Sequence, residues 1–282
     1  MARPGGPVTV CVINLKGGVG KSTIAALLAR RAFNRRGLDV LPIDLDPQAN
    51  LSQGLMHSGY SQFLKEQRTS IVEVFNGYLP PSVTTSTPQP LPSNSLFERI
   101  GHTATTSLQL IPSRFDFSDN LLGAIRPDPR TLARFLTSNF RHKDVIIIDC
   151  SPTESILTTA AYHASGLVLI PVKPEYFATI GFPLLQQSLD NFRKQNRGHQ
   201  INVAGVVVNN AFYDGGNAGG PEKTRAMREI RAESRKNGWH LYANEIQHSR
   251  GFPKLMRGDS RYQGNAQYFP RFADDFFRSV GL

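Results

Sequence analysis

The sequence predicts a single α/β domain, with a mostly parallel, twisted sheet that is covered by helices on both faces. Two observations predict this fold class. Short apolar runs rich in β-branched residues recur along the chain, and helix-like segments separate most of them. The runs are continuously apolar, which is typical of parallel strands buried on both faces. At 282 residues the chain is long enough to cover both faces of such a sheet.

The expected elements alternate along the chain. A strand at 8–13 precedes a glycine-rich turn and a helix that begins at Ser22 and is ended by Gly37. A second strand is expected at 40–43, although Pro42 is unusual inside a sheet because proline has no N–H to donate. The remaining expectations are a helix at 70–75, a strand at 108–112, a helix at 130–140, and strands at 145–148, 167–171 and 203–208.

Two stretches are expected to lie outside the regular elements. Residues 1–7 lack the apolar core of a signal peptide and are expected to form a short flexible tail. Residues 76–95 are rich in proline, serine and threonine, which does not support a regular helix or strand. We expect a surface loop or insertion there, with a partner-binding arm as the alternative.

The overall composition narrows the class of partner. The chain has 32 Lys and Arg against 22 Asp and Glu, a net charge of +10, which favours an acidic partner such as nucleic acid or an anionic membrane surface. Solubility alone is the simpler interpretation. No segment reaches the ~18 apolar residues of a membrane span. The two cysteines, Cys11 and Cys150, form no Cys-x-x-Cys pair, so we expect two buried thiols in a reducing cytosol rather than a zinc or iron–sulfur site.

The most informative motif is the glycine-rich segment at 16–23. Its glycines let backbone N–H groups converge on an anion, and the following helix adds the partial positive charge of its N-terminus. Lys21 would reach the β- and γ-phosphates, and the Ser22 hydroxyl is suited to ligate Mg²⁺. Leu15 stands where the usual P-loop pattern has a glycine, so this loop is a variant with an additional lysine, Lys16, at its start. The expected nucleotide-binding residues are Lys16, Gly17, Gly18, Val19, Gly20, Lys21, Ser22 and Thr23.

Three aspartates end two of the expected strands. Asp44 and Asp46 are two residues apart and share one face of their strand, and Asp149 closes the strand at 145–148. The carboxyl ends of parallel strands meet at one edge of the sheet, so these acids should lie near the glycine-rich loop. There they could hold a metal or orient a water molecule for phosphoryl transfer. Helix capping or turn formation is the alternative for Asp44 and Asp46.

These segments together resemble the deviant Walker ATPases of the ParA/MinD superfamily, and most closely its ParA-type DNA-partition ATPases. The resemblance rests on residues 16–23, 44–50 and 147–152, and the segment at 169–178 is also similar. It extends from about residue 8 to about residue 210 and is weaker beyond. Ser22 stands where threonine is commoner in the family, and Ser151 interrupts the usual Cys-Pro-Pro run.

The resemblance implies a P-loop NTPase fold, ATP and Mg²⁺ as cofactors, and a homodimer that sandwiches two nucleotides. It implies ATP hydrolysis with Lys16, Lys21 and Asp46 as catalytic residues, where Lys16 would reach the partner's phosphates and Asp46 would position water. Metal binding would fall to Ser22, Asp44 and Asp149, and Asn209 would contact adenine, although Asn209 could equally cap a turn.

A basic stripe indicates what the ATPase would act on. Arg225, Arg228, Arg231 and Arg235 share one face of an expected helix, which suits non-specific DNA phosphates, and Lys254 and Arg257 could extend the patch. The alternative is a solvated helix face, which acidic residues expected on the opposite side would favour.

We therefore expect a cytoplasmic, nucleoid-associated DNA-segregation ATPase whose hydrolysis a ParB-like adaptor protein stimulates. The alternatives are an ATPase that positions another cargo on the nucleoid, a MinD-like membrane-associated regulator, and a scaffold with negligible hydrolysis. The membrane alternative requires a terminal amphipathic helix. Phe272, Phe276 and Val280 form an apolar stripe there, but packing onto the core is the expected role, because Asp274 and Asp275 would face anionic lipid. The sequence identifies neither the cargo nor the adaptor protein, and it does not indicate whether the segregated DNA is a plasmid or a chromosome.

Overall fold

The computed structural model describes residues 5–76, 96–115, 128–175, 178, 180–210, 220–259 and 268–282. Within these residues the strands form one sheet in the order β3-β4-β2-β5-β1-β6-β7-β8. Neighbouring strands are parallel except β3, which is antiparallel to β4. The strands are β1 (Val8–Val12), β2 (Val40–Asp44), β3 (Glu98–His102), β4 (Ser107–Leu110), β5 (Val145–Asp149), β6 (Leu167–Val172), β7 (Asn202–Asn210) and β8 (Ile246–Gln247).

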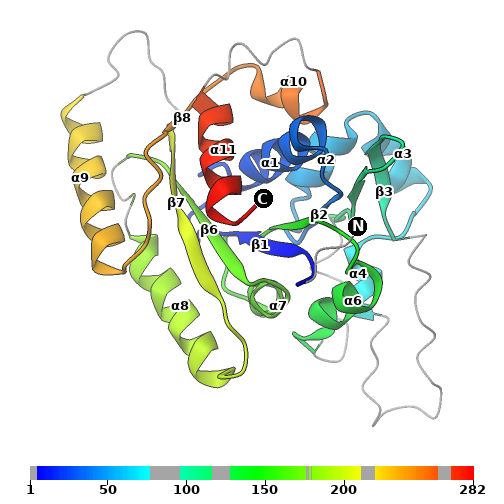
Figure 1. Ribbon diagram of the computed structural model, residues 1–282, viewed down its shortest axis with the longest axis horizontal. Helices are drawn as coiled ribbons and strands as arrows, with labels where there is room; N and C mark the ends of the chain where they lie inside the picture. Colours follow the sequence, from blue (N-terminus) through cyan, green and yellow to red (C-terminus); the bar gives the residue numbers. More distant parts are fainter. Residues whose placement is uncertain are drawn as a thin grey trace.

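Helices cover the sheet on both sides (Figure 1). One face packs against α4 (Ile71–Asn76), α6 (Thr131–Asn139), α7 (Ile156–Ala164), α8 (Gly181–Gln195) and α9 (Pro221–Lys236). The other packs against α1 (Lys21–Arg36), α2 (Asn50–Met56), α10 (Phe252–Met256) and α11 (Tyr268–Ser279), with α3 (Gly59–Lys65) beside α2. The three-layer α/β fold that the sequence predicts is therefore confirmed.

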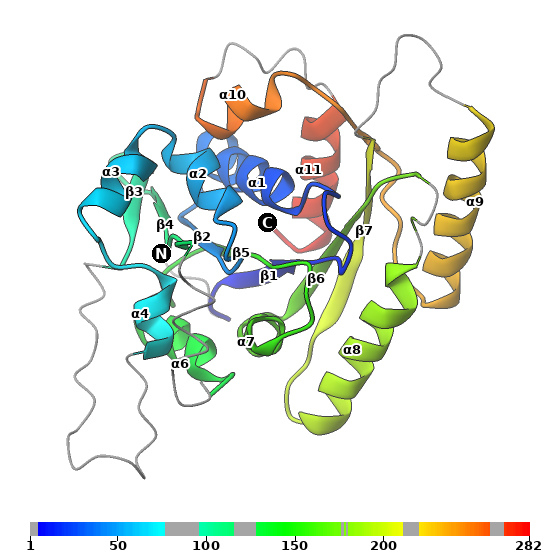
Figure 2. The same cartoon turned by 180° about the vertical axis from the view of Figure 1, so that it is seen from behind.

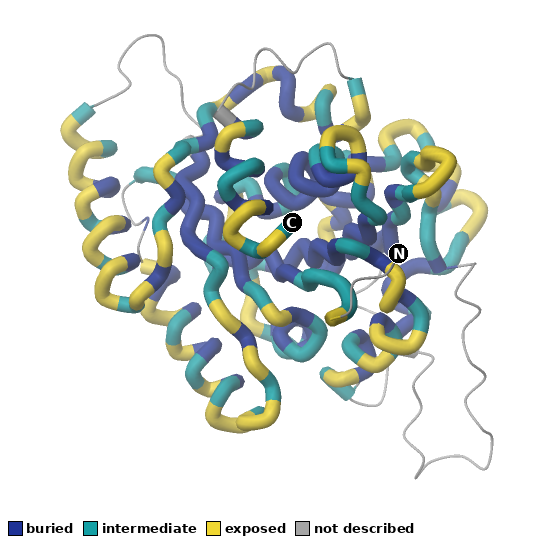
Figure 3. Tube along the Cα trace, in the orientation of Figure 1, coloured by how far each residue is buried: buried dark blue, intermediate teal, exposed yellow. Residues whose placement is uncertain are grey.

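The central strands explain why the apolar runs are continuous. Val10 and Val12 of β1 lie in the core on the α1 side, whereas Cys11 lies in the core on the α7 side, and all three are fully buried. A strand alternates its side chains between faces, so a strand covered on both faces needs apolar residues at every position. Figure 3 shows this buried centre, with exposed residues on the outer surfaces of the helices.

Most elements lie where the sequence predicts them, with ends shifted by a few residues. Gly37 ends α1 in the left-handed conformation at φ 61°. Pro42 lies in an inner strand, between β4 and β5, where its carbonyl accepts a hydrogen bond from the Ile111 N–H. Pro42 contributes no N–H to the ladder, so its place in an inner strand departs from the usual preference of proline for sheet edges. Both cysteines are buried and unpaired, as expected.

The terminal helix packs on the core, as the sequence favours. Phe272 and Phe276 of α11 are fully buried, and Asp274 forms ion pairs with Arg31 and Arg36 of α1. No helix in the described ranges has the length and apolar character needed to cross a membrane. Residues 1–4 of the expected tail and 77–95 of the expected proline-rich loop lie outside the described residues.

Candidate functional site: a phosphate-binding loop with buried carboxylates

The glycine-rich loop joins β1 to α1 at the carboxyl edge of the sheet (Figure 2). β1 lies between β5 and β6, and the chain builds the β2 side of the sheet before the β6–β8 side. The connections therefore diverge around β1, which is where open α/β sheets leave a crevice for ligands.

Two positions of the loop require glycine. Gly18 has φ +70° and Gly20 has φ +92°, values that residues with a side chain rarely adopt. A Cβ atom at Gly20 would also lie 2.2 Å from Nδ2 of Asn209. That amide nitrogen donates a hydrogen bond to the Val19 carbonyl at 2.9 Å. The Asn209 side chain, predicted as an adenine contact, thus braces the phosphate loop from the end of β7.

Lys21 lies at the base of the loop. Its side chain is buried, and its Nζ donates to the Lys16 carbonyl at 3.2 Å. Burial lowers the pKa of Lys21, whereas the nearby Asp149 and Asp46 carboxylates act to raise it. The ammonium group is thus held beneath the loop, next to acids at the ends of β5 and β2.

Asp44 and Asp149 face each other across neighbouring strands but have different partners. They are paired in the β2–β5 register, and both are fully buried. Asp44 Oδ2 accepts hydrogen bonds from the Ser52 N–H at 2.8 Å and the Ser52 hydroxyl at 2.6 Å, and Oδ1 accepts from the Asp46 N–H. Burial nevertheless raises the pKa of Asp44 to about 7. Asp44 thus organises the turn after β2.

No described residue supplies a hydrogen bond of normal geometry to either carboxylate oxygen of Asp149. Burial, and then the Asp44 carboxylate, raise the pKa of Asp149 well above its usual value, while the neighbouring Ser22 hydroxyl acts to lower it. A buried carboxyl group without a partner is costly, so this site favours a ligand that supplies positive charge or donors.

The loop and the end of β2 enclose one pocket, with about 930 Å³ of empty space that includes its solvent-open part. Asp46 lines it, and its Oδ1 accepts from the Gln48 N–H at 3.0 Å. The lining residues are Gly17, Gly18, Gly20, Lys21, Ser22, Thr23, Asp46, Gln48, Asn50, Pro152 and Met256. The structure therefore gathers most of the predicted phosphate-loop residues and Asp46 around one cavity.

Several contributors to the site went unpredicted. Gln48 and Asn50 follow Asp46 closely, so a search of the turn after β2 could have found them. Met256 comes from α10, more than two hundred residues from the loop along the chain, and no local signal marks it. Ser52, which binds Asp44, is a common residue type in an ordinary helix and carries no signal by itself.

The residues present fit a magnesium ion. Asp149 lies near Asp44, Asp46 and the buried ammonium of Lys21, and neither of its oxygens has a hydrogen-bond partner of normal geometry among the described residues. The described residues hold no preformed group of three metal-binding His, Cys, Asp or Glu side chains. Mg²⁺ itself usually keeps several waters and takes only one or two protein ligands beside phosphate. Ser22 and Asp149 are the side chains that would hold it.

Lys16 lies at the rim of the site rather than inside it. Its Nζ is 2.7 Å from Oε1 of Glu175, in the turn after β6, and both side chains are partly exposed. Its backbone N–H donates to Asn14 Oδ1, and Asn14 Nδ2 donates to the Pro171 carbonyl. The start of the loop is thereby tied to the end of β6.

The predicted basic residues fall on two separate surfaces. Arg225, Arg228, Arg231 and Arg235 are exposed on α9, and Ala226, Met227 and Ile230 of the same helix are buried. Lys254 and Arg257 are exposed on and after α10. Figures 1 and 2 both show α9 at one end of the molecule, away from α10. The two groups of basic residues therefore do not form a single patch on one copy of the chain. Glu229 is one of the acidic residues that the sequence places opposite the arginines, but it forms an ion pair with Arg225.

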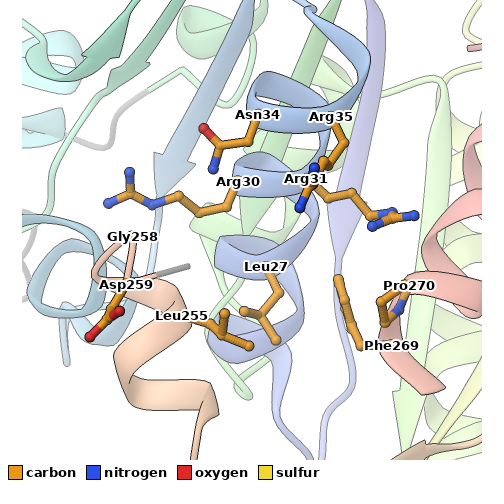
Figure 4. Close-up of a pocket in the computed structure, with 10 residues that line it drawn as sticks. All are labelled: Leu27, Arg30, Arg31, Asn34, Arg35, Leu255, Gly258, Asp259, Phe269 and Pro270. Carbon is orange, nitrogen blue, oxygen red and sulfur yellow. The ribbon is translucent and has the colours of Figure 1, made fainter. Parts of the chain in front are cut away.

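A second pocket lies between α1, α10 and α11 (Figure 4). Leu27, Leu255 and Phe269 line its apolar part. Arg30 donates to the Met256 carbonyl at 3.0 Å, and burial lowers the pKa of Arg30 to about 10. Arg31 is bound by Asp274. The arginines in this pocket thus join α1 to α10 and α11, and α10 carries Met256 to the phosphate pocket.

A glycine-rich loop after a central strand, with a buried lysine facing aspartates at the ends of two neighbouring strands, defines a P-loop nucleotide-binding protein of the α/β class. Within that class, the chain belongs to the AAA_31 family, whose model, described as an AAA domain, matches residues 8–203, and through it to the ParA/MinD superfamily.

Relatives agree with this family. The chromosome partitioning protein ParA of Caulobacter vibrioides is 30% identical over 215 residues, 73% of this chain and 69% of that protein. The sporulation initiation inhibitor protein Soj of Bacillus subtilis is 31% identical over 204 residues, 71% of each. Two uncharacterised Mycobacterium tuberculosis proteins are 29% identical over 206 residues, and the match spans 72% of this chain and 58% of their length. A solved McdA variant of Cyanothece, in complex with ATP, shares the fold at 18% identity with a TM-score of 0.74 and covers 98% of this chain and 97% of that chain.

Proposed function

We propose that this chain is an ATP-dependent DNA-segregation ATPase that dimerises with ATP and Mg²⁺, binds DNA without sequence preference, and hydrolyses ATP when an adaptor protein stimulates it. The observation that carries the proposal is the unpartnered, buried Asp149 carboxylate beside Lys21 and Ser22, under a loop whose glycines have positive φ. This arrangement supports a magnesium–triphosphate ligand. The ATP present in the similar McdA structure supports the choice of nucleotide.

The residues around the pocket suit phosphoryl transfer, which depends on charge stabilisation and on positioning more than on covalent chemistry. Backbone N–H groups of the loop and the Lys21 ammonium would bind the phosphates. Asp46 lines the pocket and would accept a hydrogen bond from the attacking water. Bound Mg²⁺ would offset phosphate charge between Ser22 and Asp149.

Lys16 would act in trans. Lys16 lies at the rim with a partly exposed side chain. If a second copy faced this edge, the Lys16 ammonium could contact the phosphates of the nucleotide bound to that copy. A cation supplied by the partner stabilises charge that develops in the transition state and makes dimerisation depend on the γ-phosphate. The proposed homodimer and its two sandwiched nucleotides rest on this reasoning.

The net charge of +10 and the exposed arginines of α9 support a DNA partner. A nucleoid location would follow from that binding. The buried Phe272 and Phe276 argue against a membrane-binding terminal helix, because their apolar surface is already covered by the core.

The proposal is tested by measuring mass and DNA affinity together. Analytical ultracentrifugation and fluorescence anisotropy should show an ATP-dependent dimer that binds DNA at least ten-fold more tightly than the ADP-bound or nucleotide-free chain, on the order of 1.4 kcal/mol. Lys16→Ala should retain ATP binding and lose both responses, whereas Lys21→Ala should lose ATP binding as well. Equal DNA affinity in all three nucleotide states would overturn the proposed switch.

A further inference from the structure

The ion pair between Lys16 and Glu175 is a resting contact outside the phosphate pocket. Neither residue lines that pocket, and their side chains are 29% and 38% exposed. Glu175 is held by its own turn, because its N–H donates to the Lys173 carbonyl and its carbonyl accepts from the Ala178 N–H. The backbone of Glu175 is therefore held at the rim, and its carboxylate meets the Lys16 ammonium there at 2.7 Å.

The same edge of the molecule carries exposed apolar side chains. Ile180 and Leu184, at the start of α8, are 58% and 52% exposed, and they are among the few large apolar side chains so exposed in the described ranges. Gly181 lies between them against the loop: a Cβ there would be 3.0 Å from Asn14 Oδ1 and 4.0 Å from the Lys16 nitrogen. A second copy that covers this apolar surface would also meet the Lys16–Glu175 pair.

We propose that Glu175 is a positioning residue that holds Lys16 in the nucleotide-free chain and releases it when a second copy presents a triphosphate. The inference rests on the proposed function, because it requires Lys16 to act on the partner's nucleotide. Glu175 thereby raises the dissociation constant of the nucleotide-bound dimer. The two anions compete for one ammonium group, and the carboxylate is the weaker because it carries a single charge whereas the triphosphate carries several.

The strength of the pair fits such an exchange. A partly exposed ion pair shifts an equilibrium by about 1.5- to 5-fold, which is enough to bias Lys16 and too little to lock it. A symmetric dimer must break two such pairs, so removing them should tighten dimerisation by about 2- to 25-fold.

The resting contact is tested first, in the nucleotide-free chain. Glu175→Gln keeps the size of the side chain and removes its charge. Asp190→Asn, which removes the charge of a partly exposed acid paired with Arg193 on α8, is the matched control. An amine-reactive reagent followed by mass spectrometry should label Lys16 about 2- to 5-fold faster in Glu175→Gln than in the parent, with Asp190→Asn unchanged. Equal labelling of Lys16 in all three proteins would overturn the resting contact.

The effect of Glu175 on dimerisation is tested by sedimentation with Mg²⁺ and a non-hydrolysable ATP analogue. Glu175→Gln should form the dimer with a dissociation constant about 2- to 25-fold lower than the parent, and Glu175→Asp, which keeps the charge, should move back toward the parent. The difference should shrink in high salt. If the parent dimerises and Glu175→Gln dimerises equally or more weakly, the inference is wrong. If the parent does not dimerise at all, the proposed function fails instead, while the labelling result still reports on the resting pair.

Discussion

Single residues of the site differ in ways that their sequence neighbourhoods do not reveal. Asp44 and Asp149 both end apolar strands and both are fully buried. Ser52 and the chain after β2 supply three hydrogen bonds to Asp44, whereas no described residue supplies one of normal geometry to Asp149. The sequence predicts two acids at one edge of the sheet, but which of them keeps free oxygens depends on a serine eight residues along the chain.

The unpartnered carboxyl group of Asp149 should lower the stability of the nucleotide-free chain. Its folded-state pKa is raised, so the folded chain holds the proton more tightly than the unfolded chain, and stability is lost as pH rises above the unfolded pKa of about 3.9. Asp149→Asn should therefore raise the free energy of unfolding at pH 7.5 by about 1–3 kcal/mol.

Urea denaturation of the parent and of Asp149→Asn at pH 7.5 and pH 4.5 checks the effect. The gain should shrink at the lower pH, because the carboxyl group of the unfolded chain is then closer to neutral and its protonation on folding costs less. Glu154→Gln removes an exposed acid from the same loop and should change little at either pH. If Asp149→Asn proves less stable than the parent at pH 7.5, this account of the site is contradicted.

The brace from Asn209 to the Val19 carbonyl gives a second test at the level of one side chain. Asn209→Ala removes that bond and leaves the carbonyl unpaired, so we expect affinity for ATP to fall about 5- to 30-fold. Because the loop binds phosphate, inorganic triphosphate should lose affinity by the same factor. An adenine contact would instead leave triphosphate binding unchanged. Asn202→Ala, at the exposed start of β7, is the control.

Among the elements, the continuously apolar strands were predictable, whereas β3, β8 and α10 were not. The run at 145–148 marks β5 because both of its faces are buried. β3 has only one strand neighbour and a mixed burial pattern, and β8 has two residues, so neither has a periodicity that can be read locally. α10 is equally short, and its role at the phosphate pocket through Met256 arises only from tertiary packing.

The α9 helix is the surface that we expect to bind DNA. Its apolar residues dock it onto the sheet, and its arginines remain exposed. Arg228→Glu should weaken ATP-dependent binding to DNA about 5- to 30-fold without preference for sequence, and should reduce the slope of log affinity against log salt by about one to two.

Fluorescence anisotropy across a salt series provides the measurement. Arg197→Glu makes the same charge change at an exposed site beyond α8 and serves as the control. An equal loss in both variants would mean that net charge, and not the α9 surface, governs the affinity. Unchanged binding in Arg228→Glu would remove α9 from the interface.

For the molecule in its entirety, the fold and the phosphate loop were predictable because both depend on local signals. Continuous apolar strands specify the sheet, and the glycines at 18 and 20 specify the loop's backbone. Contacts between distant segments were not predictable. Glu175 reaches Lys16 and Met256 reaches the pocket only because the sheet order places β6 beside β1 and α10 beside α1.

Isothermal titration calorimetry of ATP with Mg²⁺ into the folded chain tests whether the glycine-rich loop at 16–23 binds a triphosphate. The account predicts one site per chain, lost in Lys21→Ala because the buried ammonium and the loop bind the phosphates together. The melting temperature of Lys21→Ala, measured alongside, shows whether that variant is folded. Absence of heat and of any nucleotide-dependent rise in melting temperature for the parent would contradict the account.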